Sequence, residues 1–525
     1  MSLPRFYSRI SNALGPLGGS PGELMSRLST SLVSLEMGEG VEDQPAHVAG
    51  FLLAVNLCAR LYPRLHISAP ASISHQSVEL AVKINPNCEI EKSKGSGERL
   101  FWGAGTPTDS VVTVSAAGWQ ALLDQRNDNA IRPANPLSAL AAGALGVGEL
   151  FRSVFKDFLP SGRKGPRPAV LNLVTLDESS NELPDLPSTL DLGNIHVAGA
   201  GAVGQAMLHA LWHLSVGGRL VIVDPESIAL SNLQRYVLAT DGDVGTSKCA
   251  LAQRTLKGTK LDVISVETVW GNDERSTAGM ETVAVALDTA AARISVQAGL
   301  PREIYNAWTQ PADLGWSRHE RFGEEPCLAC LYTPSGLRPS QHELIARALH
   351  QAELRVLAYL TLRLPVDIAL KPEQIPRLPN YPIPTSASTW SERSILEDTM
   401  LELGVDPAAA VVWKGKPIAD LYREGICGGA LISDRVGELP QEVAVPLAHQ
   451  SALAGIMLAT QLVLARAPEL RSLRLPFIEG RLDVLSGLPQ VIGRPRQRTA
   501  GCVCSDPDYI RRYREKWSEK GHGGS

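Results

Sequence analysis

The stretch that decides the fold is NIHVAGAGAVGQAMLHALWHLSVGGRLVIVDPESIALSNLQRYVLATDGDVGTSK, residues 194–248. An apolar run leads into a Gly-x-Gly-x-x-Gly loop at Gly199, Gly201 and Gly204, and a helical pattern follows. A second apolar run ends at Asp224. This order is typical of a nucleotide-binding βαβ unit, because glycines let the backbone approach phosphate at a helix N-terminus and the acid can hold a ribose hydroxyl. The stretch therefore predicts a nucleotide site.

The polar residues that follow the acid favour a triphosphate over a dinucleotide. Asn232 and Arg235 lie three residues apart and would share one face of a helical turn. Arg235 offers a planar fork for phosphate oxygens, and Lys248 supplies a point charge. Asp288 follows a third apolar run, where a carboxylate at the end of a parallel strand would suit Mg²⁺. The alternative for Asp288 is an N-cap of the helix that begins at Thr289.

The repeated alternation of apolar runs and helical patterns predicts the fold class. We expect strands at 195–198, 220–223 and 283–287 with helices between them, which indicates an α/β fold with a doubly wound, mostly parallel, Rossmann-like sheet. The net charge of −5 gives no reason to expect nucleic acid as a partner. No segment approaches the ~20 apolar residues of a membrane span, and the N-terminus lacks the apolar core of a secretory signal. A cytoplasmic protein is the simplest expectation.

The length of 525 residues allows two to four domains of the usual size, roughly 100–200 residues each. We expect an N-terminal α/β domain, a nucleotide-binding core, an insert that carries a reactive cysteine, and a return to the core with a metal-binding tail. The corresponding ranges are 1–165, 190–334, 335–440 and 441–525.

A short internal repeat suggests that the N-terminal domain is a related but inactive half. Ser138-Ala139-Leu140-Ala141 and Ser451-Ala452-Leu453-Ala454 each open a helix rich in small residues, at 136–158 and 445–466. Chance similarity between two Ala- and Leu-rich helices is the alternative. In the first half we further expect a helix at 46–61, strands at Glu79–Ile84 and Val111–Val114, and one remnant of a glycine loop, Gly103-Ala104-Gly105.

Two close pairs of cysteines predict a metal site. Cys327 and Cys330 form one pair, and Cys502 and Cys504 form the other. Four thiolates suit a structural Zn²⁺, which would tie the C-terminal tail to the core, whereas unligated buried thiols are the alternative.

Cys427 is the lone cysteine with the surroundings of a reactive thiol. Flanking glycines in Arg423-Glu-Gly-Ile-Cys-Gly-Gly429 would expose its sulfur. An accessible, partly ionised thiol is the form of cysteine that acts as a nucleophile. A small buried residue in a Gly-rich turn is the alternative.

The segment 195–290 resembles the ATP-binding domain of the ubiquitin-activating superfamily, which includes the ThiF- and MoeB-type adenylating enzymes of thiamine and molybdopterin synthesis. The matching pieces are GAGAVG, IVDPESIALSNLQRYVL, GTSK and ALDTAAAR. The resemblance implies adenylation of the C-terminal glycine of a ubiquitin-like protein. It assigns ribose to Asp224, phosphates to Asn232, Gln234, Arg235 and Lys248, and Mg²⁺ to Asp288.

The same resemblance implies a dimer or an internal pseudo-dimer and a zinc ion held by two cysteine pairs. Those pairs are usually both Cys-x-x-Cys, so Cys502-Val-Cys504 departs from the usual spacing. The overall layout also resembles bacterial ubiquitin-like activating enzymes of phage-defence operons. That likeness implies an antiviral role, a thioester on Cys427 and transfer to a conjugating enzyme.

Three other functions fit parts of the sequence. A sulfur-carrier adenylyltransferase would form the same adenylate but a thiocarboxylate or persulfide product. An NAD-dependent oxidoreductase would need neither the Asn-Leu-Gln-Arg run nor the acid at Asp288. A non-catalytic relative would bind a partner without turnover, which Arg235, Lys248 and Asp288 argue against.

Overall fold

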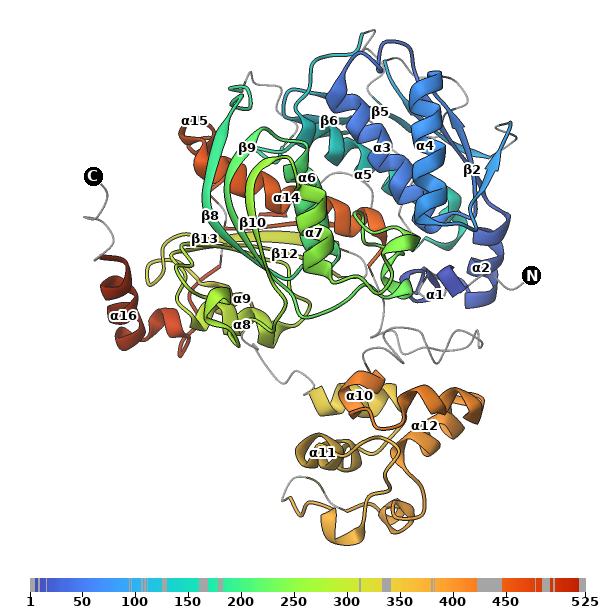
Figure 1. Ribbon diagram of the computed structural model, residues 1–525, viewed down its shortest axis with the longest axis vertical. Helices are drawn as coiled ribbons and strands as arrows, with labels where there is room; N and C mark the ends of the chain where they lie inside the picture. Colours follow the sequence, from blue (N-terminus) through green and yellow to red (C-terminus); the bar gives the residue numbers. More distant parts are fainter. Residues whose placement is uncertain are drawn as a thin grey trace. The chain divides into compact units, whose positions relative to one another are not determined.

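The computed structural model describes most of residues 5–518 (Figure 1). It leaves out 125–129, 160–168, 178–182, 311–312, 333–340, 423–445, 484–491, 519–525 and single residues or pairs near 8, 16, 94, 105, 108, 111, 379, 382, 477 and 494. The chain forms two compact units. Ser26–Thr333 and Pro446–Ser525 make the larger unit, and Met1–Met25 with Pro334–Val445 makes the smaller one. The domain ranges expected from the sequence stay predictions.

The first sheet of the larger unit has seven strands in the spatial order β3-β2-β1-β4-β5-β6-β7. Neighbours from β3 to β5 pair in parallel, and β6 and β7 continue antiparallel. The strands are β1 (Leu32–Met37), β2 (Arg64–Ser68), β3 (Glu89–Glu91), β4 (Glu98–Trp102), β5 (Val112–Ala117), β6 (Gln120–Leu123) and β7 (Ala169–Asn172). The main helices are α2 (Pro21–Thr30), α3 (Pro45–Leu61), α4 (Ala71–Ile84) and α5 (Pro136–Val154).

The second sheet has eight strands in the order β10-β9-β8-β11-β12-β13-β14-β15, parallel from β10 to β12 and antiparallel beyond. The strands are β8 (Leu190–Ala198), β9 (Val216–Val223), β10 (Lys260–Val266), β11 (Thr282–Val285), β12 (Glu303–Thr309), β13 (Asp313–His319), β14 (Glu479–Asp483) and β15 (Ile492–Gly493). The helices are α6 (Ala202–Trp212), α7 (Lys248–Leu256), α8 (Ala290–Ala298), α9 (Leu328–Tyr332), α14 (Ala448–Arg466), α15 (Pro468–Arg471) and α16 (Pro507–Ser518). The predicted α/β fold with mostly parallel, doubly wound sheets is confirmed.

The two sheets share one topology. The first seven strands of the second sheet repeat the order and directions of the first sheet, strand for strand. Helices α5 and α14 occupy corresponding places, since each follows the sixth strand of its sheet in chain order and precedes the seventh. The Ser-Ala-Leu-Ala repeat therefore lies at equivalent positions of two similarly built halves.

Helices α5 and α14 form the centre of the larger unit. Both are long and apolar enough to cross a membrane, yet 94% and 100% of their apolar windows are buried inside the protein. Glycines let neighbouring helices approach closely, because a Cβ at Gly143 would lie 2.5 Å from the Gly50 carbonyl oxygen and one at Gly455 would lie 2.5 Å from that of Val203. The pairs α3–α5 and α6–α14 consequently pack backbone to backbone.

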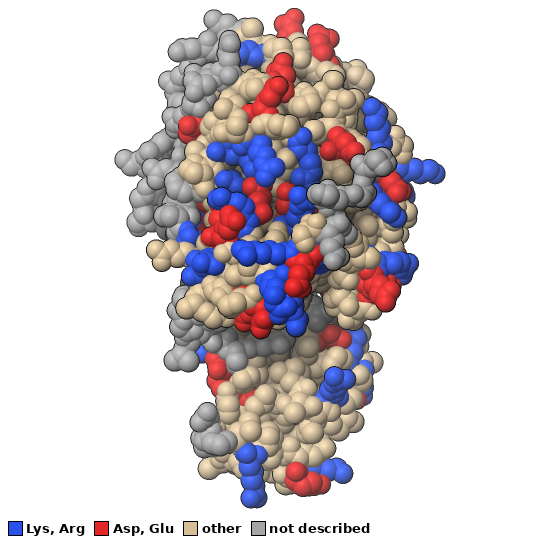
Figure 2. All heavy atoms as spheres, turned by 90° about the vertical axis from the view of Figure 1, so that its left-hand side faces the viewer, with Lys and Arg blue, Asp and Glu red and all other residues tan. Residues whose placement is uncertain are grey.

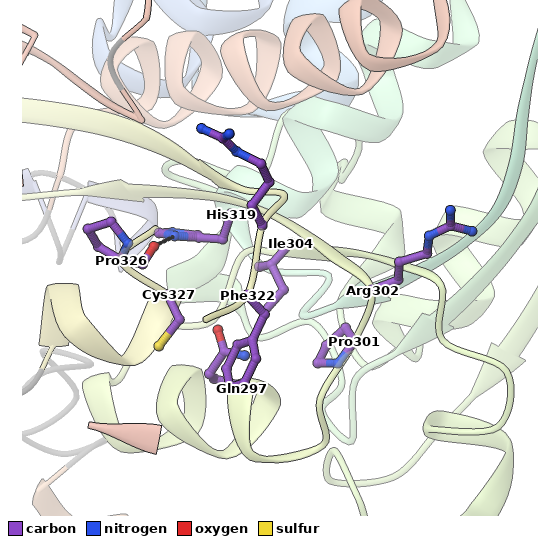
Figure 3. A pocket seen from close by; sticks show the side chains of 9 residues that line it. Gln297, Pro301, Arg302, Ile304, His319, Phe322, Pro326 and Cys327 are labelled. Carbon is purple, nitrogen blue, oxygen red and sulfur yellow. Dashed lines mark hydrogen bonds between the residues drawn. The ribbon is translucent and has the colours of Figure 1, made fainter. Parts of the chain in front are cut away.

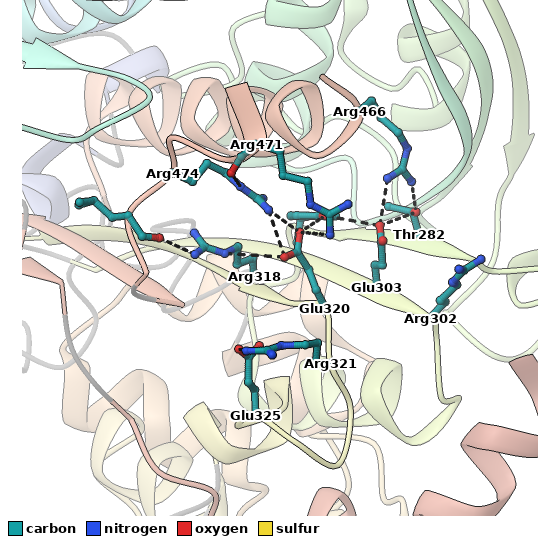
Figure 4. A network of polar contacts seen from close by, with 12 residues as sticks. Thr282, Arg302, Glu303, Arg318, Glu320, Arg321, Glu325, Arg466, Arg471 and Arg474 are labelled. Carbon is teal, nitrogen blue, oxygen red and sulfur yellow. Dashed lines mark hydrogen bonds and ion pairs between the residues drawn. The ribbon is translucent and has the colours of Figure 1, made fainter. Parts of the chain in front are cut away.

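A cluster of ion pairs fixes the end of α14 to the second sheet (Figure 4). Arg466 donates to Glu303 at 3.0 Å, to Thr282 at 2.5 Å and to the carbonyl oxygen of Leu192 at 3.2 Å, which joins the starts of β12, β11 and β8. On the face in Figure 2, acidic side chains lie among basic ones. In Figure 4, Arg466 pairs with Glu303, and Arg471 and Arg474 pair with Glu320.

Two expectations for the first half were wrong. Glu79–Ile84 forms the last part of α4 instead of a strand, because the buried residues Ile73, Ser77, Ala81 and Ile84 recur at helical spacing and only the end of this helix reads as an apolar alternation. The glycine loop that corresponds to Gly199 follows β1 at Gly38-Glu39-Gly40, whereas Gly103 follows β4. The expected helices at 46–61, 136–158 and 445–466 are confirmed as α3, α5 and α14.

The smaller unit is mainly helical and has its own core. Its longer helices are α10 (Gln341–Ala348), α11 (Glu353–Leu362) and α12 (Ile395–Leu403), with the short elements η1 (Arg5–Tyr7), α1 (Ile10–Ala13), η6 (Pro372–Gln374), η7 (Thr385–Thr389), η8 (Pro407–Trp413) and α13 (Ile418–Asp420). Tyr359, Trp390 and Met400 are among the buried residues of this core. Helix α12 begins with a capping box, in which Ser394 and Glu397 bond to each other's backbone amides.

Candidate functional site

The glycine loop between β8 and α6 has the tight geometry that phosphate binding requires. Gly199 has φ of +97°, and its amide donates to Val223 at the end of β9 at 3.0 Å. A Cβ at Gly204 would lie 2.2 Å from the carbonyl oxygen of Gly199. Gly201 is the N-cap of α6, so the first amides of this helix are available to an anion at the loop.

Asp224 lies at the end of β9, directly beside this loop. It is 7% exposed, and its two oxygens accept hydrogen bonds from the amides of Ala200 at 2.8 Å and Glu226 at 2.9 Å. Burial raises the pKa of Asp224, while Lys248 and the two amides act in the opposite direction. A nearly buried carboxylate at this strand end is suitably placed to accept hydrogen bonds from a ribose.

Lys248, the first residue of α7, is held against two carboxylates. Its Nζ lies 2.5 Å from Glu226, 3.8 Å from Asp224 and 5.3 Å from the centre of the Tyr236 ring. Burial acts to lower the pKa of Lys248, but Tyr236, Asp224 and Glu226 outweigh it and raise the pKa overall. Glu226 was not predicted from the sequence, although it follows Asp224 by only two residues.

The segment after Asp224 contains two buried polar atoms without a partner. Gln234 is 2% exposed, and neither its Oε1 nor the Nε of Arg235 has a hydrogen-bond partner among the described residues. Asn232 differs, since its Oδ1 accepts from the amide of Ala229 at 2.9 Å and so caps the local turn. An unpaired buried polar atom is costly, which makes the Gln234–Arg235 turn a suitable place for a polar ligand.

Asp288 lies three residues beyond β11 and is exposed. The N-cap of α8 is Thr289, whose hydroxyl accepts from the amide of Ala292 at 3.2 Å, so Asp288 does not cap this helix. Arg293 in the first turns of α8 is 4% exposed and donates to Leu287, Asn306 and Ala307. This arginine joins the ends of β11 and β12, and its charge also interacts with the exposed carboxylate of Asp288.

The four paired cysteines meet in one buried cluster. The Sγ atoms of Cys327 and Cys330 are 4.0 Å apart, and they lie 3.5 Å from Cys502 and 3.4 Å from Cys504, respectively. All four ligand atoms lie within 4.8 Å of one another. A tetrahedral zinc with ~2.3 Å bonds places its sulfurs about 3.8 Å apart, so this donor set fits Zn²⁺.

The cluster favours the thiolate form at Cys330, whereas hydrogen bonds with Cys330 raise the pKa of Cys327 and burial raises the pKa of Cys502. Hydrogen bonds from Cys327 and Cys504 lower the pKa of Cys330, which also accepts from the amide of Thr499 at 3.4 Å. A small hollow lined by Gln297, His319 and Phe322 adjoins Cys327 (Figure 3). One ring nitrogen of His319 is hydrogen-bonded to the carbonyl oxygen of Pro326 at 2.8 Å, and the other is hydrogen-bonded to the hydroxyl of Ser317 at 3.0 Å. These bonds hold the end of β13, which leads to the pair Cys327 and Cys330.

Helix α16 follows the second cysteine pair and docks on the end of α8. Lys516 donates to the carbonyl oxygen of Gly299 at 2.8 Å, Trp517 donates to that of Leu300 at 3.1 Å, and Tyr513 donates to that of Arg302 at 2.9 Å. The cysteine cluster and these bonds together attach the tail to the second sheet. Cys427, the predicted thioester-forming residue, lies outside the described residues.

The glycine loop, the buried acid after β9 and the carboxylate after β11 lie at the carboxyl ends of parallel strands of one α/β sheet. The profile of the ThiF family matches residues 186–350. Over 536 aligned positions the chain is 34% identical to the uncharacterized protein y4jF of Sinorhizobium fredii (strain NBRC 101917 / NGR234), a match that covers 98% of both chains. The chain belongs to the same family as that protein and carries a ThiF family domain related to the E1 and MoeB enzymes.

Two further similarities are more limited. The SAMP-activating enzyme E1 of Haloferax volcanii is 36% identical over 110 residues, which cover 20% of this chain and 40% of that one. A solved structure described as the crystal structure of SeMet PaaA is 18% identical over 25% of this chain and 43% of that chain, with a TM-score of 0.22. The family makes this protein adenylyltransferase-like, and enzymes of this kind use ATP and Mg²⁺.

Proposed function

We propose that this protein uses ATP to activate the C-terminal glycine of a ubiquitin-like protein. The observation that carries the proposal is the arrangement around Asp224. The acid is bonded to the glycine loop and lies beside Lys248, while Gln234 Oε1 and Arg235 Nε have no partner among the described residues. These groups would receive ribose and phosphates, with Asn232 supporting the turn.

In the proposed first step, the partner's carboxylate oxygen attacks the α-phosphorus of ATP and pyrophosphate leaves, which gives an acyl-adenylate. Arg235 and Lys248 would stabilise the negative charge that develops on the phosphates. Asp288 would hold Mg²⁺, which neutralises phosphate charge when bound. Lys248 would have to exchange part of its contact with Glu226 for phosphate.

In the proposed second step, the thiolate of Cys427 attacks the carbonyl carbon of the adenylate, AMP leaves, and a thioester forms. The ubiquitin-like protein would then pass to the thiol of a conjugating enzyme. The first half would serve as an inactive partner, so that the chain is an internal pseudo-dimer. We further propose Zn²⁺ at Cys327, Cys330, Cys502 and Cys504, and a cytoplasmic location.

Exchange of labelled pyrophosphate into ATP tests the first step. With small proteins that end in glycine, we expect exchange that depends on the partner, and its loss in Asp224→Ala. No exchange with any partner would contradict the adenylation proposal.

A gel without reducing agent tests the second step. We expect an adduct that dithiothreitol cleaves and that Cys427→Ala lacks, with Cys249→Ala as the control because Cys249 is buried in α7. Adenylation that yields a thiocarboxylate only when a sulfur donor is present would support the sulfur-carrier alternative.

A further inference from the structure

A buried arginine of the first half contacts the turn segment of the second half. Arg60 in α3 is fully buried. Its Nη1 donates to the carbonyl oxygen of Leu233 at 2.5 Å, its Nη2 donates to that of Ala239 at 2.8 Å, and its Nε donates to Oδ1 of Asn56 at 2.8 Å. The planar guanidinium thus connects both ends of segment 233–239 to one helix.

Asn56 adds a third connection from the same face of α3. It lies one helical turn before Arg60 and is 5% exposed, and its Nδ2 donates to the carbonyl oxygen of Val237 at 2.9 Å. Its Oδ1 accepts from Arg60, so the two side chains fix each other. Three carbonyls of segment 233–239 are therefore bonded to the first half.

The segment itself has only short turns. The amide of Arg235 donates to Asn232 at 3.0 Å, and the amide of Ala239 donates to Tyr236 at 3.0 Å. A segment of isolated turns has little intrinsic stability, because each turn fixes several dihedral angles for a single bond. Its conformation consequently depends on tertiary contacts, which are the burial of Leu233, Tyr236 and Val237 and the hydrogen bonds from α3.

Arg60 stays charged under ordinary conditions, and each of its three nitrogens donates one hydrogen bond. Burial lowers the pKa of Arg60 to about 9, with Asp243 acting in the opposite direction, so the guanidinium is protonated at neutral pH. All three of its nitrogens donate to Asn56, Leu233 and Ala239. The two terminal nitrogens of the guanidinium therefore contact the backbone of segment 233–239.

We propose that Arg60, supported by Asn56, is a positioning residue that holds Gln234 and Arg235 in the orientation that binds the triphosphate. The proposal rests on the proposed function, since it assumes that these two side chains receive phosphate. It gives the first half a specific role, because α3 then completes the nucleotide site of the other half.

Substitution of two similar buried asparagines, Asn56 and Asn85, distinguishes an effect on the position of segment 233–239 from a general loss of stability. Asn85 is fully buried and Asn56 is nearly so, and the Nδ2 of Asn85 donates to the carbonyl oxygen of Ala59 at 3.0 Å, within the first half. Asn56→Ala and Asn85→Ala each remove a buried amide that donates to a backbone carbonyl. Binding of α,β-methylene-ATP with Mg²⁺, measured by calorimetry, should weaken about tenfold in Asn56→Ala and stay within about twofold of the unsubstituted protein in Asn85→Ala.

Arg60→Lys provides the graded variant. Lysine keeps the charge, but a single ammonium cannot span the acceptors that the guanidinium fork reaches, so we expect a larger loss of nucleotide affinity than in Asn56→Ala, with KM for ATP raised in the exchange assay. Thermal unfolding reports whether each variant is folded. Hydrogen exchange should accelerate at amides 230–243 in Asn56→Ala and Arg60→Lys but not in Asn85→Ala.

The outcomes are distinct. Equal nucleotide affinity in Asn56→Ala and Asn85→Ala, or unchanged exchange at 230–243 in Arg60→Lys, would overturn the positioning role. Failure of the unsubstituted protein to bind the nucleotide would instead contradict the proposed function, and the positioning role would fall with it. Weaker nucleotide binding together with faster hydrogen exchange at 230–243, in variants whose thermal unfolding is like that of the unsubstituted protein, would support the positioning role.

Discussion

The two halves of the larger unit have the same strand order but differ in the loops at the carboxyl ends of their first two strands. In the second half, Asp224 directly follows β9, and a long segment separates this acid from α7. In the first half, β2 is followed by Ala69-Pro70, and α4 begins at once at Ala71. The sheet therefore provides a frame in both halves, but only one half has the acid and the basic segment that a nucleotide site needs.

The halves also differ in whether a cysteine cluster attaches another segment to their sheet. The second sheet is tied to the C-terminal tail by a cluster of four cysteines, whereas Cys58 and Cys88, buried in the first half, belong to no such cluster among the described residues. Two experiments test these differences and a third tests the contact between the halves, in order of the size of the expected effect.

The largest effect is expected at the cysteine cluster. Cys504→Ser should abolish stoichiometric zinc and lower the free energy of unfolding by about 4 kcal/mol, a fraction of the ~10–16 kcal/mol typical of structural zinc sites. Metal analysis and thermal unfolding measure both. The control is Cys58→Ala in α3, which removes a buried thiol at a cost of about 1 kcal/mol. Equal zinc content in the Cys504→Ser and unsubstituted proteins would contradict the site.

The second effect concerns the strand ends. Asp224→Ala should lower kcat/KM for pyrophosphate exchange about 100-fold, because it removes a carboxylate that would accept charge-assisted hydrogen bonds from ribose. Ser68→Ala, at the end of the corresponding strand β2, should leave exchange unchanged. A similar loss in both variants would mean that the halves are not functionally different at this position.

The smallest effect is a pH dependence at the contact between the halves. His449 in α14 lies against Phe151 of α5, with ring centres 5.7 Å apart, and burial lowers its pKa to about 3. The unfolded chain takes up this proton near pH 6.5 and the folded protein does not, so stability is lost as the pH falls from about 6.5 towards 3.

His449→Gln should therefore reduce the slope of the unfolding free energy against pH by up to about 1.4 kcal/mol per pH unit between pH 6 and 4. This value corresponds to the uptake of one proton on unfolding. Denaturant unfolding at several pH values measures this slope. The control is His75→Gln on the exposed face of α4. An unchanged slope in His449→Gln would mean that this histidine is protonated in the folded protein.

Much of the second half could be predicted from sequence because its signals are local. The glycine loop, Asp224 and the adjoining strands are close together in the chain, and periodicity and loop chemistry are sufficient there. The first half has no such motif, and the end of α4 was therefore predicted as a strand. Its Gly38-Glu39-Gly40 loop is recognisable only by its place after the first strand.

Contacts across long sequence distances could not be predicted in the same way. Arg60 and Leu233, or Cys327 and Cys502, come together only through the packing of the two halves and the return of the chain. A close cysteine pair gives a signal by composition, so the cluster was expected. A lone arginine in an apolar helix, such as Arg60, gives no such signal. Glu226 was not predicted because its partner Lys248 lies at the start of α7, 22 residues further along the chain.

The return of the chain has a consequence during protein synthesis. Strands β13 and β14 are paired neighbours, but the whole of residues 334–445 is made between them. At ~5–20 residues per second the ribosome needs on the order of ten seconds to deliver β14 after β13. During that time a nascent chain has a complete seven-stranded first sheet, while the second exposes an open edge that invites aggregation or chaperone binding.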